Sequence, residues 1–453
     1  MKESISERIG RFVHSLTYGE IPEEVIEKAK TCMINGIGIG ISCYGTEFAE
    51  IARRTIKAEE SNMVSNKSAT IFCDYSKVSV MGAAFANSCL FHGRTQEDTL
   101  GSSHAGTIVI PAVLAIAERE GNSGREVIEA VVAGYEVVGC LDSMLSKYTT
   151  PRGFRASSIF GIFGSVSAAS KLFKLSEEET VNAVGLAAAF ASGTVECFIA
   201  GTVEWRFEVG VACRDGILAC LIAKNGAKAS RTALEGKSGF LDAFANAIEH
   251  SEEIAKNLGQ SWQIMAAGFK PYPVCYFNQT PVLAMLDIVT KHKIEPNAVE
   301  QIKIYVNPHE YHYPGMNYRG PFTTIGSTLM SAPFCLALAF VEKDVTLEGL
   351  NRFKDKDILG LINRTERIAD ENMPQFSCRL DVQIKGGEKL SKEMVVSADY
   401  FNFDMEQDIK LVKKVTEEAG LGQEKTDKLI AILKDFDKAD SVKNLIELLG
   451  QCP

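Results

Sequence analysis

The stretch Asn87–Glu120, NSCLFHGRTQEDTLGSSHAGTIVIPAVLAIAERE, places a short polar loop directly before an apolar helix, and the rest of the chain is organised around it. The loop holds two histidines, an arginine and two acids: His92, His104, Arg94, Glu97 and Asp98. Reactive side chains on a loop that a rigid helix holds in place are typical of catalytic or binding sites. A solvated loop with a buried, hydrogen-bonded histidine is the alternative that this stretch alone leaves open.

The sequence on both sides of this loop is almost entirely helical up to about residue 265. Val80–His92 is a helix of small residues that leads into the loop, and Glu23–Ile41 is another helix. The glycines Gly36, Gly38 and Gly40 lack the GxGxxG spacing and the preceding strand of a nucleotide-binding loop. We therefore interpret them as sites of close helix packing.

Five further helices are expected before residue 265. They are Pro111–Glu120, Gly124–Leu145 after Ser123, Phe160–Phe173, a helix that follows the N-cap Ser176, and one within Gly201–Asn225. A serine before a first turn rich in acids favours a helix start, because its side chain accepts from the free N–H groups of that turn.

The pattern changes near Met265, where prolines and alternating strands begin. Val299–Val306 alternates as a half-buried strand does, Ser331–Val341 is a short buried helix, and Ser377–Ala398 is a hairpin that turns at two glycines. From Asp404 the chain returns to amphipathic helices, which we expect to pack on the first domain. The predicted fold is mainly α, with a large all-helical domain (residues 1–265 and 399–453) and a smaller α+β domain (266–398).

The composition is that of a soluble globular protein, with 46% apolar and 23% charged residues and a net charge of −10. This charge and the lack of a basic run argue against a nucleic-acid partner. No apolar run reaches the roughly 18 residues of a membrane span, and the charged N-terminal helix is no signal peptide. Twelve cysteines without a CxxC pair indicate buried thiols in a reducing compartment. We expect a cytoplasmic protein.

Three junctions between loops and helices carry the candidate chemistry. The first holds Thr95, Asp98, Thr99 and His104, the second is PRGFRASS with Arg155, and the third pairs Arg206 with Lys270. Two or three cations beside a histidine suit a di- or tricarboxylate, since arginine binds carboxylates bidentately and histidine moves protons near neutral pH. The alternative to a substrate-binding role is that each of these cations, taken alone, is a surface charge or a helix-capping charge.

Other catalytic classes find little support in the sequence. His309 and His312 have HxxH spacing, but the preceding Asn307 and Pro308 indicate a loop, and no third ligand has a recognisable spacing. We therefore predict no metal site. The sequence has neither the GxSxG elbow of serine hydrolases nor a Walker A loop.

Taken together, these segments resemble the MmgE/PrpD family, which includes 2-methylcitrate dehydratases, cis-aconitate decarboxylases and iminodisuccinate epimerases. The resemblance covers essentially the whole chain in order: AFANSCLFH and EDT, SHAGTIVIPAVLAIAE, RGFRASSIFGIFGSVSAASKL, LAAAFASG, LEGKSGF, FKPYPVC and SAPFCLAL. It implies a helical domain with an α+β lid, a homodimer, an active site between the domains, and no metal or organic cofactor.

Residue by residue, the resemblance implies that Asp98, Thr99 and His104 form the family's polar loop and that Lys270 is its KPYP lysine. Several family positions are changed here. The histidine after RGF is Arg155, the aspartate that opens the family's DFDDT is Thr95, and the lysine after the GT turn is Trp205, beside Arg206. The family's Leu-His next to that lysine is Phe207-Glu208, and a histidine of the decarboxylase branch falls at Cys275.

We therefore expect a cofactor-independent lyase or isomerase that abstracts a proton next to a carboxylate of a small di- or tricarboxylate, as a 2-methylcitrate dehydratase does. His104 is the expected general acid/base, with Asp98 orienting it or Thr99. The expected substrate-binding residues are Thr95, Arg155, Arg206, Lys270, Cys275 and Tyr318. Decarboxylation, epimerisation and a non-catalytic carboxylate-binding protein are the alternatives. Because Arg155 stays protonated, it favours a substrate with an extra negative group, or a one-base reaction such as epimerisation.

Overall fold

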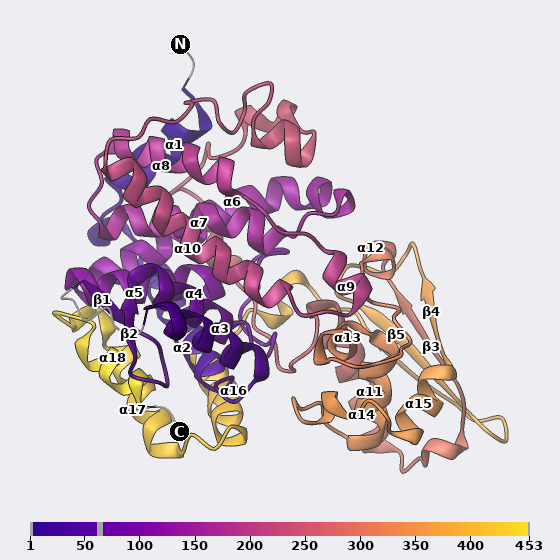
Figure 1. Cartoon of the computed structure of the whole chain (residues 1–453). Helices are drawn as coiled ribbons and strands as arrows, with labels where there is room; N and C mark the ends of the chain where they lie inside the picture. Colours follow the sequence, from indigo (N-terminus) through magenta and orange to yellow (C-terminus); the bar gives the residue numbers. More distant parts are fainter. Residues whose placement is uncertain (1–2, 61–66, 452–453) are drawn as a thin grey trace.

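The computed structural model describes residues 3–60 and 67–451. It confirms the predicted fold class, a mainly α protein with a smaller α+β domain (Figure 1). In Figure 1 the α+β domain, in orange, lies beside the helical domain, and the yellow C-terminal helices lie against the indigo N-terminal part.

The helical domain contains thirteen of the α-helices that the structure describes, together with a small antiparallel pair of strands. The helices are α1 (Ile5–Ser15), α2 (Glu23–Ile41), α3 (Glu47–Glu60), α4 (Val80–Phe91), α5 (Gly106–Glu120), α6 (Gly124–Thr149), α7 (Ala156–Leu172), α8 (Glu177–Phe190), α9 (Glu196–Ala200), α10 (Trp205–Lys224), α16 (Met405–Glu418), α17 (Gln423–Lys434) and α18 (Lys443–Gly450). The strands are β1 (Ser68–Thr70) and β2 (Lys77–Ser79), which the sequence did not predict.

The α+β domain is built on a four-stranded sheet in the order β4-β3-β5-β6. Its elements are α11 (Gln279–Lys291), β3 (Val299–Val306), α12 (Pro308–His312), α13 (Ile325–Met330), α14 (Ala332–Glu342), α15 (Lys356–Asn363), β4 (Thr365–Ala369), β5 (Cys378–Ile384) and β6 (Lys389–Met394). The predicted strand β3 and the hairpin β5–β6 are confirmed. β4, which pairs with β3 in parallel, was not predicted.

The serine helix caps and the close packing at glycines that the sequence predicts are both present in the structure. The side chains of Ser123 and Ser176 cap α6 and α8, each in a reciprocal capping box with a glutamate three residues later. Each cap stabilises its helix by about 1 kcal/mol. The glycines of α2 serve close packing: a Cβ at Gly38 would lie 2.4 Å from Val412, and one at Gly40 would lie 2.4 Å from Phe91.

Helix α5 begins five residues earlier than predicted. Pro111 lies inside the helix, Gly106 is its first residue and Ala105 its N-cap, so His104 lies two residues before the helix begins. Gly106 allows this early start because the chain here passes tightly over the polar loop. A Cβ on Gly106 would lie 2.3 Å from Asp98 Oδ1 and 2.7 Å from the Tyr135 hydroxyl.

Two hydrophobic cores hold the chain together. The larger core spans the helical domain, and the smaller one fills the space between the sheet and α11, α14 and α15. Cys197 and Trp205, from the helical domain, belong to the smaller core, so α9 and the start of α10 join the two domains. The C-terminal tail lies against the helical domain, where α16 packs on α2.

Three global features bear on function. No helix in residues 3–60 and 67–451 is long and apolar enough to cross a membrane. Within the same ranges, no group of three or more His, Cys, Asp or Glu side chains is arranged to hold a metal ion. Ten cysteines within residues 3–60 and 67–451 are free, as expected, but Cys73 is disulfide-bonded, so the prediction of thiols alone is wrong at that residue.

Candidate active site

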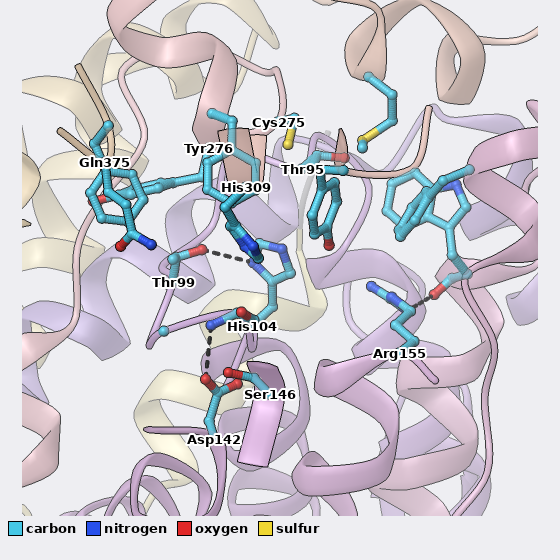
Figure 2. Close-up of a pocket in the computed structure, with 18 of the residues that line it drawn as sticks. Thr95, Thr99, His104, Asp142, Ser146, Arg155, Cys275, Tyr276, His309 and Gln375 are labelled. Atoms are coloured by element: carbon cyan, nitrogen blue, oxygen red, sulfur yellow. Dashed lines mark hydrogen bonds between the residues drawn. The ribbon is translucent and has the colours of Figure 1, made fainter. Parts of the chain in front are cut away.

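A cavity of about 360 Å³ lies between the helical and the α+β domains, and we call it the first cavity. The helical domain supplies one wall, which includes His92, Thr95, Thr99, His104, Asp142, Ser146, Lys147, Arg155 and Trp205. The α+β domain supplies the other wall, which includes Cys275, Tyr276, Phe277, His309, Tyr313, Gln375 and Phe376. Figure 2 shows the two walls facing each other, with His104 between Asp142 below and Tyr276 and Gln375 above.

Backbone hydrogen bonds fix the polar loop in this wall. Thr99 and Gly268 exchange two N–H···O bonds of 2.8 Å each, which tie the loop to the segment before the α+β domain. The N–H of His104 donates to Ser157 Oγ at 3.1 Å, at the start of α7. Thr95 has a φ of +58°, a backbone conformation that is uncommon outside glycine and marks a tightly constrained turn.

The hydrogen bonds of His104 define its protonation state. Its Nδ1 lies 3.0 Å from the carbonyl oxygen of Asp98, and a carbonyl only accepts. Nδ1 therefore carries the hydrogen, and the Thr99 hydroxyl is a further neighbour at 3.3 Å (Figure 2). This leaves Nε2 unprotonated and without a hydrogen-bond partner among the described residues, and 16% of the side-chain surface is exposed.

Electrostatics keep the His104 ring neutral. Burial, with the positive charge of Lys270, lowers the pKa of His104 well below 6.5, although Glu97 opposes the shift. A neutral imidazole with an unprotonated Nε2 at a cavity wall is the state that a general base requires at neutral pH.

His92 has a different role from His104. Its Nδ1 donates to Glu97 Oε1 at 2.6 Å, and its Nε2 accepts from Arg155 Nη2 at 2.6 Å. Both ring nitrogens are thus engaged, and the side chain is fully buried. Burial, together with Arg155 and Lys270, lowers the pKa of His92 well below 6.5. His92 is therefore a neutral link that holds Arg155 in place.

Arg155 is less available to a substrate than the sequence suggested. Its Nη1 donates to the main-chain oxygen of Trp205 and lies 3.4 Å from Glu208 Oε2, while Nη2 donates to His92. Glu208 also accepts from Ser158 Oγ at 3.1 Å. Arg155 lines the first cavity, but its charge is largely balanced by Glu208.

Asp98 contacts His104 through its backbone rather than its side chain. Its Oδ2 accepts from the Tyr135 hydroxyl at 2.6 Å, away from the first cavity, while its carbonyl oxygen holds His104. Burial raises the pKa of the Asp98 carboxyl to about 6. The expected orienting role of Asp98 therefore rests on the carbonyl, and that of Thr99 on a hydroxyl beside the same Nδ1.

The structure brings five of the predicted site residues to the first cavity: Thr95, Thr99, His104, Arg155 and Cys275. Lys270 is fully buried behind this wall, 4.0 Å from Glu97 Oε1, and burial lowers its pKa. Tyr318 does not line the cavity, because its hydroxyl donates to the carbonyl of Pro321 at 2.7 Å.

Arg206 lies outside the first cavity. Its guanidinium is stacked between the rings of Phe48 and Trp205, 3.9 Å from each, and lines a different cavity. The expectation that it binds the same substrate as Arg155 is therefore not met in this structure. The physical reason is helical geometry: adjacent residues point about 100° apart, and Trp205, not Arg206, faces the first cavity.

Several lining residues were missed by the sequence reading. Asp142, Ser146 and Lys147 come from the last turns of α6, where a buried acid in an apolar helix was the available signal. Burial raises the pKa of Asp142 to about 6, and its carboxylate accepts from the Ser102 N–H at 3.0 Å and from Ser103 Oγ. Asp142 thus supports the loop before His104.

The α+β wall contributes His309 and Tyr313, which lie at either end of α12. The loop predicted at this HxxH pair is wrong, because Asn307 caps a short helix by accepting from the His309 N–H at 2.9 Å. His309 lines the first cavity, whereas His312 is exposed. Aromatic rings (Phe277 and Tyr313) pack against His309.

Comparisons with known proteins agree with this architecture. Residues 7–253 match the model of the MmgE/PrpD N-terminal domain, and residues 272–436 match that of the MmgE/PrpD C-terminal domain. The chain is 23% identical to the cis-aconitate decarboxylase of Homo sapiens, over 99% of this chain and 95% of that protein. It is 24% identical to the cis-aconitate decarboxylase of Aspergillus terreus, over 78% of this chain and 75% of that protein.

Proposed function

The chain belongs to the MmgE/PrpD family, and from this premise we propose that it is a lyase or isomerase that moves a proton next to a carboxylate of a small di- or tricarboxylate. The observation that carries the proposal is the state of His104. Its Nδ1–H is held by the Asp98 carbonyl, which leaves Nε2 unprotonated, and the residue lines the first cavity.

In this proposal His104 Nε2 removes the proton on the carbon next to a substrate carboxylate. The reaction develops negative charge on that carboxylate, and groups already aimed at it lower the barrier because they need no reorganisation. Lys147, an exposed cation of the first cavity, supplies most of this stabilisation, and Arg155 supplies less because Glu208 balances much of its charge. Thr95 and Ser146 add hydroxyl groups on the same wall.

The walls of the first cavity favour a substrate with two carboxylates over one with three. Arg155 is already paired with Glu208, and Lys270 and Arg206 do not line this cavity. Rings from both domains give much of the lining an apolar character: Phe198, Trp205, Phe277, Tyr313 and Phe376. A third carboxylate would lose its hydration here without gaining a free cation, and such desolvation is costly.

Decarboxylation is the second candidate. The relatives named above are cis-aconitate decarboxylases, and a carboxy-lyase needs an acid that returns a proton to carbon after carbon dioxide leaves. His309 and Tyr313 face the first cavity from the α+β domain and are the candidates for that acid. A non-catalytic binding protein is less favoured, since it would have no use for a free, neutral Nε2.

The test is an NMR screen of dicarboxylates, tricarboxylates and amino-dicarboxylates in deuterium oxide. Deuterium wash-in without net product indicates epimerisation, loss of water indicates dehydration, and loss of carbon dioxide indicates decarboxylation. We expect a dicarboxylate to react, and His104→Gln to lower its turnover by about 10²-fold or more.

The matched control is His292→Gln, at an exposed histidine that does not line the first cavity, and this variant should react like the wild type. Turnover by His104→Gln within a few-fold of wild type would show that His104 is not the base. Binding of a carboxylate with no exchange of any proton would favour the non-catalytic alternative.

A further inference from the structure

A second cavity of about 770 Å³ also lies between the two domains, and its chemistry is not used by the proposed reaction. Its walls come from the α2–α3 junction, the start of α10, the segment before α13, the segment between α14 and α15, and the end of α16. Arg206, Arg94, Phe48 and Thr324 are among the side chains that line it.

Arg206 is the unusual feature of this cavity. Its side chain is fully buried, and none of its three guanidinium nitrogens has a hydrogen-bond partner among the residues that the structure describes. Phe48 and Trp205 stack on the two sides of the guanidinium at 3.9 Å, which holds it in place without satisfying its N–H groups. Burial lowers the pKa of Arg206 to about 9.

The acids around the second cavity do not balance this charge. Glu47 and Glu348 also line the cavity, and Glu418 is paired with Arg94 at 2.7 Å. No carboxylate within residues 3–60 and 67–451 lies within 4.0 Å of the Arg206 guanidinium, whose nitrogens have no hydrogen-bond partner there. An unpaired buried charge destabilises a protein, so five N–H donors in a fixed, planar fork are a costly arrangement unless a partner arrives from solution.

We propose that the second cavity binds a small oxyanion, the carboxylate or phosphate group of a metabolite, through Arg206. Both groups present paired oxygens that match the guanidinium fork. The cavity has the volume for a ligand larger than the anion itself. This site does not depend on the reaction proposed for the first cavity.

Trp205 separates this site from the first cavity and links the two. Its ring packs edge-on against His92, with centroids 4.7 Å apart, and it stacks on Arg206. Its main-chain oxygen accepts from Arg155 in the first cavity. An anion on Arg206 is therefore one residue away from a wall of the candidate active site.

The experiment measures thermal unfolding of the full chain with increasing inorganic phosphate or, separately, acetate, each against sodium chloride of equal ionic strength. The variants are Arg206→Met, which fits between the two rings without charge, and Arg214→Met, a control on the same helix whose arginine is 42% exposed beside Asp215. Acetate and phosphate together distinguish a carboxylate from a phosphate ligand.

Without anion, Arg206→Met should melt at a higher temperature than wild type, because the unpaired buried charge is gone. With saturating anion, the wild type and Arg214→Met should gain roughly 2 °C or more, and Arg206→Met should gain nothing. Equal gains in all three proteins, or no gain in any, would overturn the proposal. A change in oligomeric mass caused by Arg206→Met would also overturn it, by assigning Arg206 to a subunit interface.

Discussion

At the scale of the residue, the backbone carbonyl of Asp98 and the carboxylate of Asp98 have separate tasks. The carbonyl fixes the hydrogen on His104 Nδ1, whereas the carboxylate accepts from Tyr135 away from the first cavity. We therefore predict that Asp98→Asn, which keeps both acceptors, lowers kcat/KM by less than about tenfold, far less than the loss expected for His104→Gln. Steady-state kinetics of the two variants on the same substrate decide this. Equal losses would mean that the Asp98 carboxylate takes part in the chemistry.

The pH dependence of catalysis follows from the protonation of His104. A general base must be neutral, and the pKa of His104 lies well below 6.5, so kcat/KM should be flat from about pH 6.5 to 8 and fall only in more acidic solution. Asp142, whose pKa is raised to about 6, lines the same cavity and is a second group that titrates on the acid side. The profile of Asp142→Asn separates the two groups. A rate that falls as pH rises through 7 would contradict a neutral base.

Some site residues could be predicted from the sequence and others could not, and individual residues show why. Thr95, Thr99 and His104 lie on one loop before a helix, so the sequence alone places them together. Trp205 and Arg206 are adjacent on α10, and which of them faces the first cavity depends on the rotation of that helix by about 100°. The small residues that follow allow close packing on several sides, so the pattern does not determine that rotation.

At the scale of the element, one buried acid links the C-terminal tail to the helical domain. Asp408 of α16 accepts from Asn35 of α2 at 2.6 Å, and burial raises its pKa to about 8. In the unfolded chain this carboxyl titrates near 4, so the folded state holds an extra proton between about pH 4 and 8. The contribution of Asp408 to stability is therefore full below pH 4 and is lost as pH rises through 8.

Asp408→Asn keeps the acceptor for Asn35 but cannot ionise, so it should remove this loss. We predict that the melting temperature of the variant, relative to wild type, increases from pH 5 to about pH 8 and then levels off. Glu406→Gln, at a largely exposed position on the same helix, is the control and should show no such trend. A pH-independent difference for Asp408→Asn would mean that Asp408 is ionised throughout.

The elements themselves were predictable where their signal is local. The alternation of apolar and polar residues identified β3. The β5–β6 hairpin was identified by its turn at Gly386 and Gly387, which both have positive φ. β4 is five residues long with two charged side chains, and it becomes a strand by pairing in parallel with β3 across some sixty residues of chain. No local pattern reports such a non-local pairing.

At the scale of the whole molecule, the first cavity exists only because two domains meet. Lys147 at the end of α6 and His309 on α12 lie far apart in sequence, and docking of the α+β domain brings them to one cavity. The periodicity of either helix shows which face is buried but not what it faces. This is why the helical wall was predicted better than the α+β wall.

The family also implies a homodimer. We predict that light scattering of the purified chain gives twice its mass of 49.4 kDa at micromolar concentration. Dilution should not change the mass if the dimer is stable, since obligate interfaces are large and apolar. A monomer at all concentrations would contradict this expectation, while leaving the first cavity, formed within one chain, intact.

The proposed function requires that His104 is a neutral base with its hydrogen on Nδ1. The most direct test is a long-range ¹H–¹⁵N NMR spectrum of histidine-labelled protein at pH 7, with the His104 signals assigned from their absence in His104→Gln. The structure predicts a protonated Nδ1 and an unprotonated Nε2 for His104, as its bond to the Asp98 carbonyl requires. A hydrogen on Nε2, or a ring protonated at both nitrogens, would contradict it.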